Sequence, residues 1–190
     1  MALKPGERKT QILQTLAGML EQPQGEKITT AALAAKVGVS EAALYRHFAS
    51  KAQMFEALIE FVEESVFTLV NQIAQTERDG RAQANQTVDM LLGFAEKNPG
   101  MVRVLIGDAL VNEDGRLQTR INQLTDRLEA SLKQSLQLVP PPGALPAAEA
   151  ANALVAMVIG RWHLYAKSGF RRKPTSDWAQ QAAFLRLTAA

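Results

Sequence analysis

The chain has 190 residues, no cysteine, a formal net charge of +2, 47% hydrophobic residues and 21% charged residues. This composition is typical of folded globular proteins and excludes disulfide frameworks, thiolate metal sites and fibrous or disordered chains. The first nine residues carry charges, and no run of 18 apolar residues occurs, so we expect a cytoplasmic protein without an export signal or membrane span.

Apolar residues recur at helical spacing along the whole chain, and no stretch alternates long enough to predict a strand. We therefore predict an all-α fold of nine helices. They are expected at about residues 6–21, 30–37, 41–48, 51–75, 82–97, 101–112, 114–139, 147–168 and 176–187. The fourth predicted helix is long enough to pack on both a small N-terminal head and a larger body. We therefore predict two domains, a head of residues 1–51 and a body of residues 52–190.

The segment 28–51 has the layout of a helix-turn-helix, a motif that binds DNA. Gly38 suits a tight turn between two short helices, and Val39, Leu44 and Phe48 are expected to face inward. The remaining side chains of the second helix must then point outward, where a recognition helix meets a major groove. The charge agrees with this reading, since residues 1–51 carry +3 and residues 52–190 carry −1.

The outward residues have chemistry that suits duplex DNA. Tyr45 can donate its hydroxyl to a phosphate, and Arg46 can pair with a phosphate or with guanine. Three further residues, Thr29, Thr30 and Lys51, stand at helix starts, where backbone N–H groups favour phosphate. The alternative is that Tyr45 is a half-buried core aromatic and Arg46 is merely solvated.

The sequence does not predict an enzyme. Its two histidines are His47 and His163, and it contains no HExxH motif and no phosphate-binding glycine loop. We expect no catalytic residue, no metal site and no cofactor. The acidic pairs Glu63–Glu64 and Glu113–Asp114 are interpreted as solvated helix faces or termini.

The stretch ITTAALAAKVGVSEAALYRHFASKAQMFEALIEF resembles the N-terminal domain of the TetR family of dimeric DNA-binding proteins. The resemblance implies a homodimer with two heads about 34 Å apart over successive major grooves of a pseudo-palindrome, and it leaves open more than one dimer per DNA site. By analogy with the family, the residues nearest phosphates are Thr29, Thr30, Tyr45, His47 and Lys51. Those nearest the bases are Ser40, Glu41, Ala42, Ala43 and Arg46.

The body segments LLGFAEKNPGMVRVLIGDAL and DGRLQTRINQLTDRLEASLKQ resemble the nucleoid occlusion members of that family. These members bind chromosomal sites and, while bound, oppose polymerisation of the tubulin-like division GTPase FtsZ. The resemblance implies a nucleoid-associated protein with a partner surface on the fourth and fifth helices. The corresponding residues are Phe61, Leu69, Met90, Gly93, Lys97 and Asn98.

Some of these residues depart from the pattern or have a simpler explanation. Leu69 stands where the pattern has a basic residue, and Lys97 replaces an arginine, so recognition of an acidic tail is expected to differ. Phe61 and Met90 are equally compatible with core packing. Two other functions stay open: a TetR-type repressor released by a small molecule, and a helical interaction module that does not touch DNA.

Overall fold

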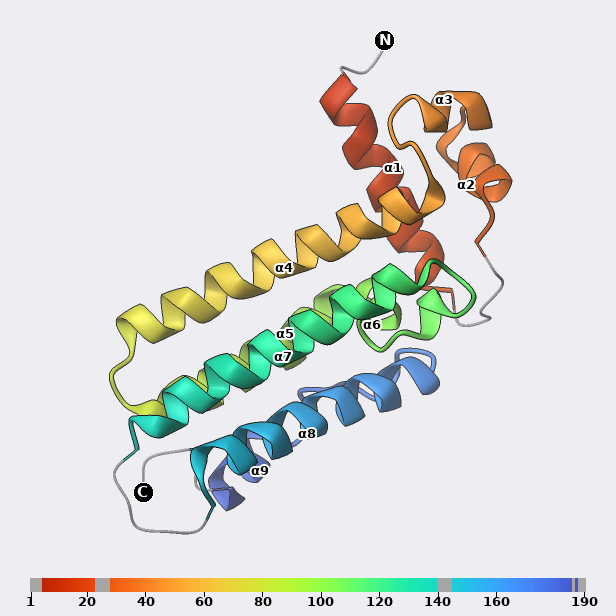
Figure 1. Ribbon diagram of the computed structural model, residues 1–190. Coiled ribbons are helices and arrows are strands. Elements are labelled where there is room, and N and C mark those ends of the chain that lie inside the picture. Colours follow the sequence, from red (N-terminus) through yellow and green to blue (C-terminus); the bar gives the residue numbers. More distant parts are fainter. Residues whose placement is uncertain (1–4, 23–27, 140–144, 186, 188–190) are drawn as a thin grey trace.

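A computed structural model describes residues 5–22, 28–139, 145–185 and 187 (Figure 1). Within these ranges the chain forms nine α-helices and one short 3-10 helix and no strand, which confirms the predicted all-α class. The helices are α1 (Pro5–Leu20), α2 (Thr30–Val37), α3 (Glu41–Tyr45), α4 (Lys51–Thr76), α5 (Gly80–Lys97), α6 (Pro99–Leu105), the 3-10 helix η1 (Asp108–Leu110), α7 (Gly115–Gln137), α8 (Ala147–Lys167) and α9 (Trp178–Phe184).

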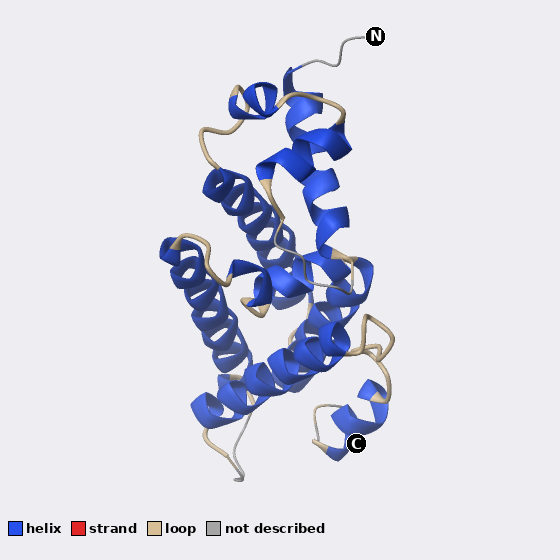
Figure 2. Cartoon of the chain, turned by 90° about the vertical axis from the view of Figure 1, so that its right-hand side faces the viewer, coloured by secondary structure: helices blue, strands red, loops and turns tan. Residues whose placement is uncertain are grey.

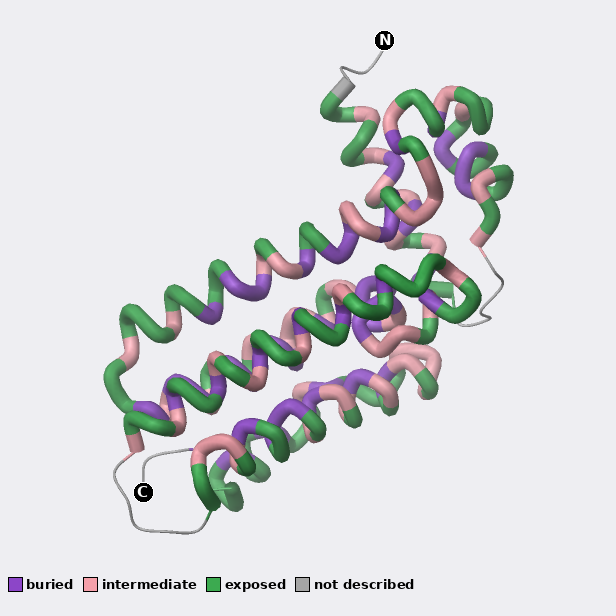
Figure 3. Tube along the Cα trace, in the orientation of Figure 1, coloured by how far each residue is buried: buried purple, intermediate pink, exposed green. Residues whose placement is uncertain are grey.

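The first three helices form a small head at one end of an elongated helical body (Figures 1 and 2). The long helix α4 starts at the head and runs along the body. There α7 packs on α4, α5 and α8. The buried residues line the facing sides of these helices and form one continuous core from head to body (Figure 3).

Short polar side chains fix where the helices of the head begin. Thr29 accepts a hydrogen bond from the Ala32 N–H at the start of α2, and Ser40 accepts one from the Ala43 N–H at the start of α3. Helix α2 ends at Gly38, whose φ of 80° is left-handed and unfavourable for a side chain. The start signals, the turn and the glycine therefore lie where the sequence predicted them.

Several predicted helices are shorter in the structure, among them the third, the sixth and the ninth. The third ends at Tyr45, so Arg46 and His47 lie in the following turn. The sixth ends at Leu105 because Gly107 adopts a left-handed φ of 79°, and η1 replaces its predicted last turns. The ninth covers only Trp178–Phe184.

A close contact between α1 and α6 joins the head to the body. A side chain on Gly100 would place its Cβ atom 2.2 Å from the Ala17 carbonyl oxygen, so only glycine allows this approach. Nearby, the Arg103 guanidinium donates to the Gln22 carbonyl oxygen (3.3 Å) and to the Asp108 carboxylate (2.8 Å). The head is therefore held against the body by packing and by hydrogen bonds.

Helices α4 and α7 are connected by an ion pair that the sequence did not predict. The Arg120 guanidinium donates to the Glu63 carboxylate over 2.6 Å, and both side chains are largely shielded from solvent. The hydrogen bond to Glu63 raises the pKa of Arg120 above its ordinary value. The interpretation of Glu63 as part of a solvated face was therefore wrong.

Candidate nucleic-acid interface

The helix-turn-helix is built on an apolar interior that the sequence largely predicted. Leu44 is fully buried, Phe48 is 3% exposed, and Val39 is half-buried against the same core. Leu33 and Ala34 of α2 are also buried. Because these residues hold α3 against α2, the opposite side of α3 is turned to solvent.

The solvent-facing side of α3 and the turn after it carry most of the residues expected to touch DNA. Tyr45 is 45% exposed and is not one of the side chains packed in or against the core, so it is not the half-buried core aromatic of the alternative interpretation. Arg46, Glu41, Ala42 and Ser40 are also exposed, and the remaining two, Ala43 and His47, are half-buried. The structure therefore gathers a phenol, a guanidinium and a carboxylate on one accessible surface.

Two of the predicted DNA-contacting residues are bonded to each other. The Thr30 hydroxyl donates to the Glu41 carboxylate over 2.6 Å and links the start of α2 to the start of α3. In contrast, the side-chain oxygens of Thr29 and Ser40 accept from backbone N–H groups, which leaves their hydroxyl hydrogens available for an acceptor such as phosphate. Thr30 can serve a phosphate only if its hydroxyl turns away from Glu41.

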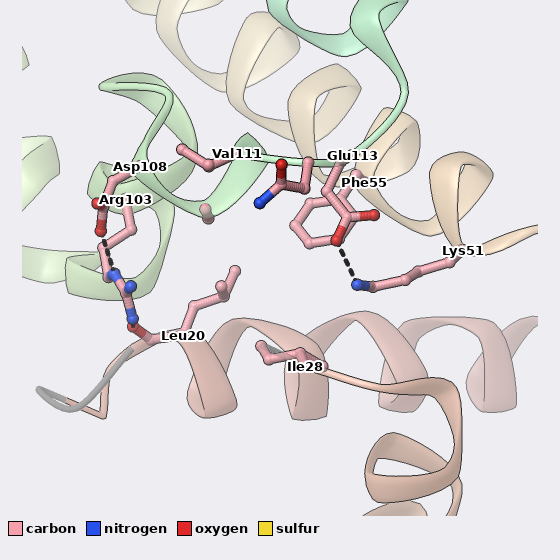
Figure 4. A pocket seen from close by; sticks show the side chains of 10 residues that line it. Leu20, Ile28, Lys51, Phe55, Arg103, Asp108, Val111 and Glu113 are labelled. Carbon is pink, nitrogen blue, oxygen red and sulfur yellow. Dashed lines mark hydrogen bonds and ion pairs between the residues drawn. The ribbon is translucent and has the colours of Figure 1, made fainter. Parts of the chain in front are cut away.

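Lys51, the first residue of α4, contacts the body in this structure. Its ammonium nitrogen lies 2.5 Å from a carboxylate oxygen of Glu113 and 5.6 Å from the centre of the Phe55 ring (Figure 4). From the sequence alone, we interpret Glu113 and Asp114 together as a solvated helix face or terminus. That interpretation is wrong for Glu113, whose side chain is 12% exposed, and correct for Asp114, which caps α7.

The residues expected to bind a protein partner lie on α4, on α5 and just after it. Phe61 and Leu69 are 49% and 41% exposed, so plain core packing does not account for Phe61. Met90 is half-buried and packs against the core, as its alternative interpretation allowed. The other three are half-buried Gly93, exposed Lys97 and half-buried Asn98.

Asn98 also has a structural role that the sequence did not reveal. Its side-chain amide donates to the Phe94 carbonyl oxygen over 2.8 Å at the end of α5. Its own carbonyl oxygen accepts from the Met101 N–H at the start of α6. Asn98 therefore connects α5 to α6, whatever partner it contacts.

Sequence reasoning missed the residues that connect the head to the body, Arg103 and Glu113. Each lies far along the chain from its partner, since 81 positions separate Arg103 from Gln22 and 62 separate Lys51 from Glu113. No spacing rule within a helix reports such pairs. The only signal available was charge, which many solvated side chains share.

Over the described part of the chain, no cluster of three or more histidine or acidic side chains could hold a metal ion. No helix in that part is long and apolar enough to cross a membrane.

Comparison with known proteins agrees with the fold. The family described as "Bacterial regulatory proteins, tetR family" matches residues 25–58, and the SlmA-like family described as "Tetracyclin repressor-like, C-terminal domain" matches residues 78–188. The chain therefore belongs to the TetR family of helix-turn-helix regulators, which are DNA-binding proteins and not enzymes.

Individual relatives indicate to which group within the TetR family the chain is most similar. It is 51% identical over 191 residues to the nucleoid occlusion factor SlmA of Alteromonas mediterranea, with 98% of each chain covered. It is also 51% identical to the SlmA of a Marinomonas species, with 95% of this chain and 94% of the relative covered. Within the TetR family it thus falls in the SlmA-like group of nucleoid occlusion factors.

Solved structures show the same fold at low identity. A TetR-like transcriptional regulator from Rhodococcus sp. RHA1 superposes with a TM-score of 0.73 at 19% identity, covering 100% of both chains. The fatty acid degradation regulator FadR from Bacillus halodurans gives a TM-score of 0.73 at 15% identity, covering 100% of this chain and 98% of the other. At this identity the likeness supports the nine-helix arrangement alone.

Proposed function

We propose that this protein binds pseudo-palindromic chromosomal sites as a homodimer and, while bound, inhibits polymerisation of FtsZ, so that septa do not form over the nucleoid. In this proposal residues 1–51 bind DNA and residues 52–190 supply dimerisation and partner contacts. The near full-length identity to curated nucleoid occlusion factors carries it. The protein would be nucleoid-associated within the cytoplasm.

The exposed side of α3 supports the DNA-binding step. Tyr45 and Arg46 can reach a phosphate or a base edge without disturbing the core, because the buried residues Leu44 and Phe48 already fix α3. The exposed Ala42 leaves room for close approach to a groove. In this arrangement the residues that bind phosphates are Thr29, Thr30, Tyr45, His47 and Lys51. The residues nearest the bases are Ser40, Glu41, Ala42, Ala43 and Arg46.

Exposed apolar side chains on α8 and α9 support a dimer. Leu164 and Leu185 are each 43% exposed, and Phe184 is 86% exposed. Large apolar side chains exposed on these segments are what an interface with a second copy would cover. We propose that α8 and α9 pack against the same helices of a second copy, which leaves both heads free for DNA.

The neighbouring helices α4 and α5 support the site for FtsZ. Phe61 and Leu69 lie eight residues apart, so they project from similar sides of α4. Exposed Lys97 adds a positive charge at the end of α5. An extended acidic segment with apolar side chains fits this surface, with Leu69 contributing apolar contact where a basic residue stands in related proteins.

The close packing between α5, α7 and α8 leaves no room for a ligand at that place, which supports this function over a repressor released by a ligand bound there. The cavity lined by Leu91, Leu128, Val158 and Trp162 has a volume of about 10 Å³, room for about one water molecule. Trp162 closes it further by donating its indole N–H to the Leu91 carbonyl oxygen. A metabolite would have to displace core side chains to enter between α5, α7 and α8.

The decisive experiment first selects bound sites from a random duplex library and maps them on the chromosome. Sites spread along the chromosome are expected, whereas sites confined to promoters would favour a repressor. FtsZ polymer is then measured by sedimentation with the protein alone and with the protein on a selected duplex. Unchanged FtsZ polymer in the presence of the DNA-bound protein would refute the proposed inhibition.

Two sets of variants separate DNA binding from partner binding. Tyr45→Ala combined with Arg46→Ala is expected to abolish salt-sensitive DNA binding, while Arg78→Ala, an exposed arginine beyond the far end of α4, leaves it unchanged. Phe61→Ser combined with Leu69→Ser is expected to keep DNA binding and lose FtsZ inhibition. Leu145→Ser, which is 64% exposed elsewhere, is the matched control.

A further inference from the structure

The ion pair between Lys51 and Glu113 occupies the junction of head and body. It lines a pocket with Leu20, Phe55 and Val111, on one side of which lies the first turn of α4 (Figure 4). The Lys51 and Glu113 side chains are 19% and 12% exposed. A pair shielded to this degree is screened by salt less than a pair on the open surface.

Glu113 is held in place by the body. Its N–H donates to the Leu110 carbonyl oxygen over 3.0 Å. The preceding residue, Asn112, has a left-handed φ of 65°, and the following residue, Asp114, caps α7. The Glu113 backbone is therefore fixed between η1 and α7, and we take Lys51, which has the longer side chain, as the member of the pair that moves.

Lys51 has a second anionic partner if the proposed function is correct. It follows the capping residue Ser50 at the N-terminus of α4, and a phosphate near that helix end would attract its ammonium group. A lysine paired with a carboxylate presents little net charge to a phosphate. Binding through Lys51 therefore requires the ammonium to leave Glu113, at the cost of that ion pair.

We propose that Glu113 sets the DNA affinity of the head by competing with DNA phosphate for Lys51. This inference rests on the proposed DNA-binding function and adds a body residue to it. Glu113 acts as a positioning residue, because it touches Lys51 and not the DNA. In the free protein it ties the first turn of α4 to the body, and DNA binding releases that tie.

The competition also gives the body a means to respond to DNA. When Lys51 turns to a phosphate, the Glu113 carboxylate loses its cation, and the turn between η1 and α7 loses a contact with the head. The neighbouring ion pair of Arg103 with Asp108 lies within the body and does not involve Lys51. A contact broken only on DNA is what a DNA-dependent activity requires.

The test compares Glu113→Gln, Lys51→Gln and the double variant in DNA binding over a range of salt concentrations, using a duplex recovered by the library selection. Glu60→Gln, on an exposed residue of α4, controls for the loss of one negative charge. We expect Glu113→Gln to bind about three- to tenfold tighter than Glu60→Gln and to steepen the salt dependence by about one counterion. In the Lys51→Gln background, removal of Glu113 should change nothing.

Three results would contradict the inference. The first is that Glu113→Gln and Glu60→Gln bind the duplex with equal affinity, and the second is that Glu113→Gln binds it more weakly. The third is that Glu113→Gln has the same effect with and without Lys51. Each of these results would overturn the inference and leave the proposed function intact. Absence of any selected duplex for the unchanged protein would overturn both. Far-UV circular dichroism and thermal melting of each variant verify that the folded protein is being compared.

Discussion

The close approach of α6 to α1 at Gly100 predicts a large effect from the smallest possible side chain. Gly100→Ala would place a Cβ atom 2.2 Å from the Ala17 carbonyl oxygen, where real Cβ contacts stay beyond 3.0 Å, so the helices must separate by about 1 Å. The obstacle is backbone, which cannot rotate away. Overpacking of this kind costs about 1–3 kcal/mol, and the better helix propensity of alanine offsets at most about 1 kcal/mol.

At the middle of both ranges the net loss is about 1.5 kcal/mol, which corresponds to a fall in melting temperature of about 3–6 °C for a chain of this size. Thermal unfolding followed by circular dichroism at 222 nm measures it. Gly18→Ala is the matched control, because Gly18 follows Ala17 on α1 and its Cβ would meet no atom within 4 Å; it should melt at or above the unchanged protein. If Gly100→Ala melts no lower than the unchanged protein, the close contact between α1 and α6 is not present in solution.

Three other substitutions test the core, the dimer and the pH response. Leu44→Ala removes a fully buried side chain of α3 and should cost about 2–5 kcal/mol in chemical unfolding; a loss under 0.5 kcal/mol, about that of a surface substitution, would argue against the inward assignment. Phe184→Ser combined with Leu164→Ser should shift sedimentation equilibrium from dimer towards monomer, and an unchanged dimer would move the interface elsewhere. The backbone N–H of Asp79, and to a smaller extent that of Arg78, donates to the Glu77 carboxylate and holds the pKa of Glu77 below its ordinary value. The contribution of this carboxylate to the free energy of unfolding is therefore present above the ordinary glutamate pKa and is lost as the pH falls through the lower, folded-state pKa. Glu77→Gln should therefore lower the melting temperature at pH 7 and lose that effect in acid, and an equal effect at both pH values would exclude the carboxylate as its cause.

The head was more predictable from sequence than the junction, because its signals are local. Thr29, Gly38 and Ser40 act on backbone groups within four residues of themselves, and a sequence reader can apply the same geometry. The sixth helix was predicted to continue to about residue 112, whereas Gly107 adopts a left-handed φ of 79° and the helix ends before it at Leu105.

The sequence predicted which residue types lie in the candidate site, but it did not predict which hydrogen bonds and ion pairs they form. The exposure of Tyr45 and Arg46 follows from the burial of Leu44 and Phe48, which hydrophobic spacing indicates. The bonds of Thr30 to Glu41 and of Lys51 to Glu113 do not follow from spacing, because both depend on how separate helices dock. Tertiary packing, not local propensity, decides which partner a polar side chain takes.

Helix α4 has a mechanical consequence of its own. It runs unbroken for 26 residues without proline or glycine, the residues at which helices usually bend. Leu69 lies 18 residues beyond Lys51, about 27 Å along the axis at 1.5 Å per residue. If the helix turns as a rigid rod about its first residue, a tilt of about 5° moves Leu69 by about 2 Å and Phe61 by about half as much. Because the displacement grows with distance along the helix, a small movement of the head would shift the far end of α4 the most.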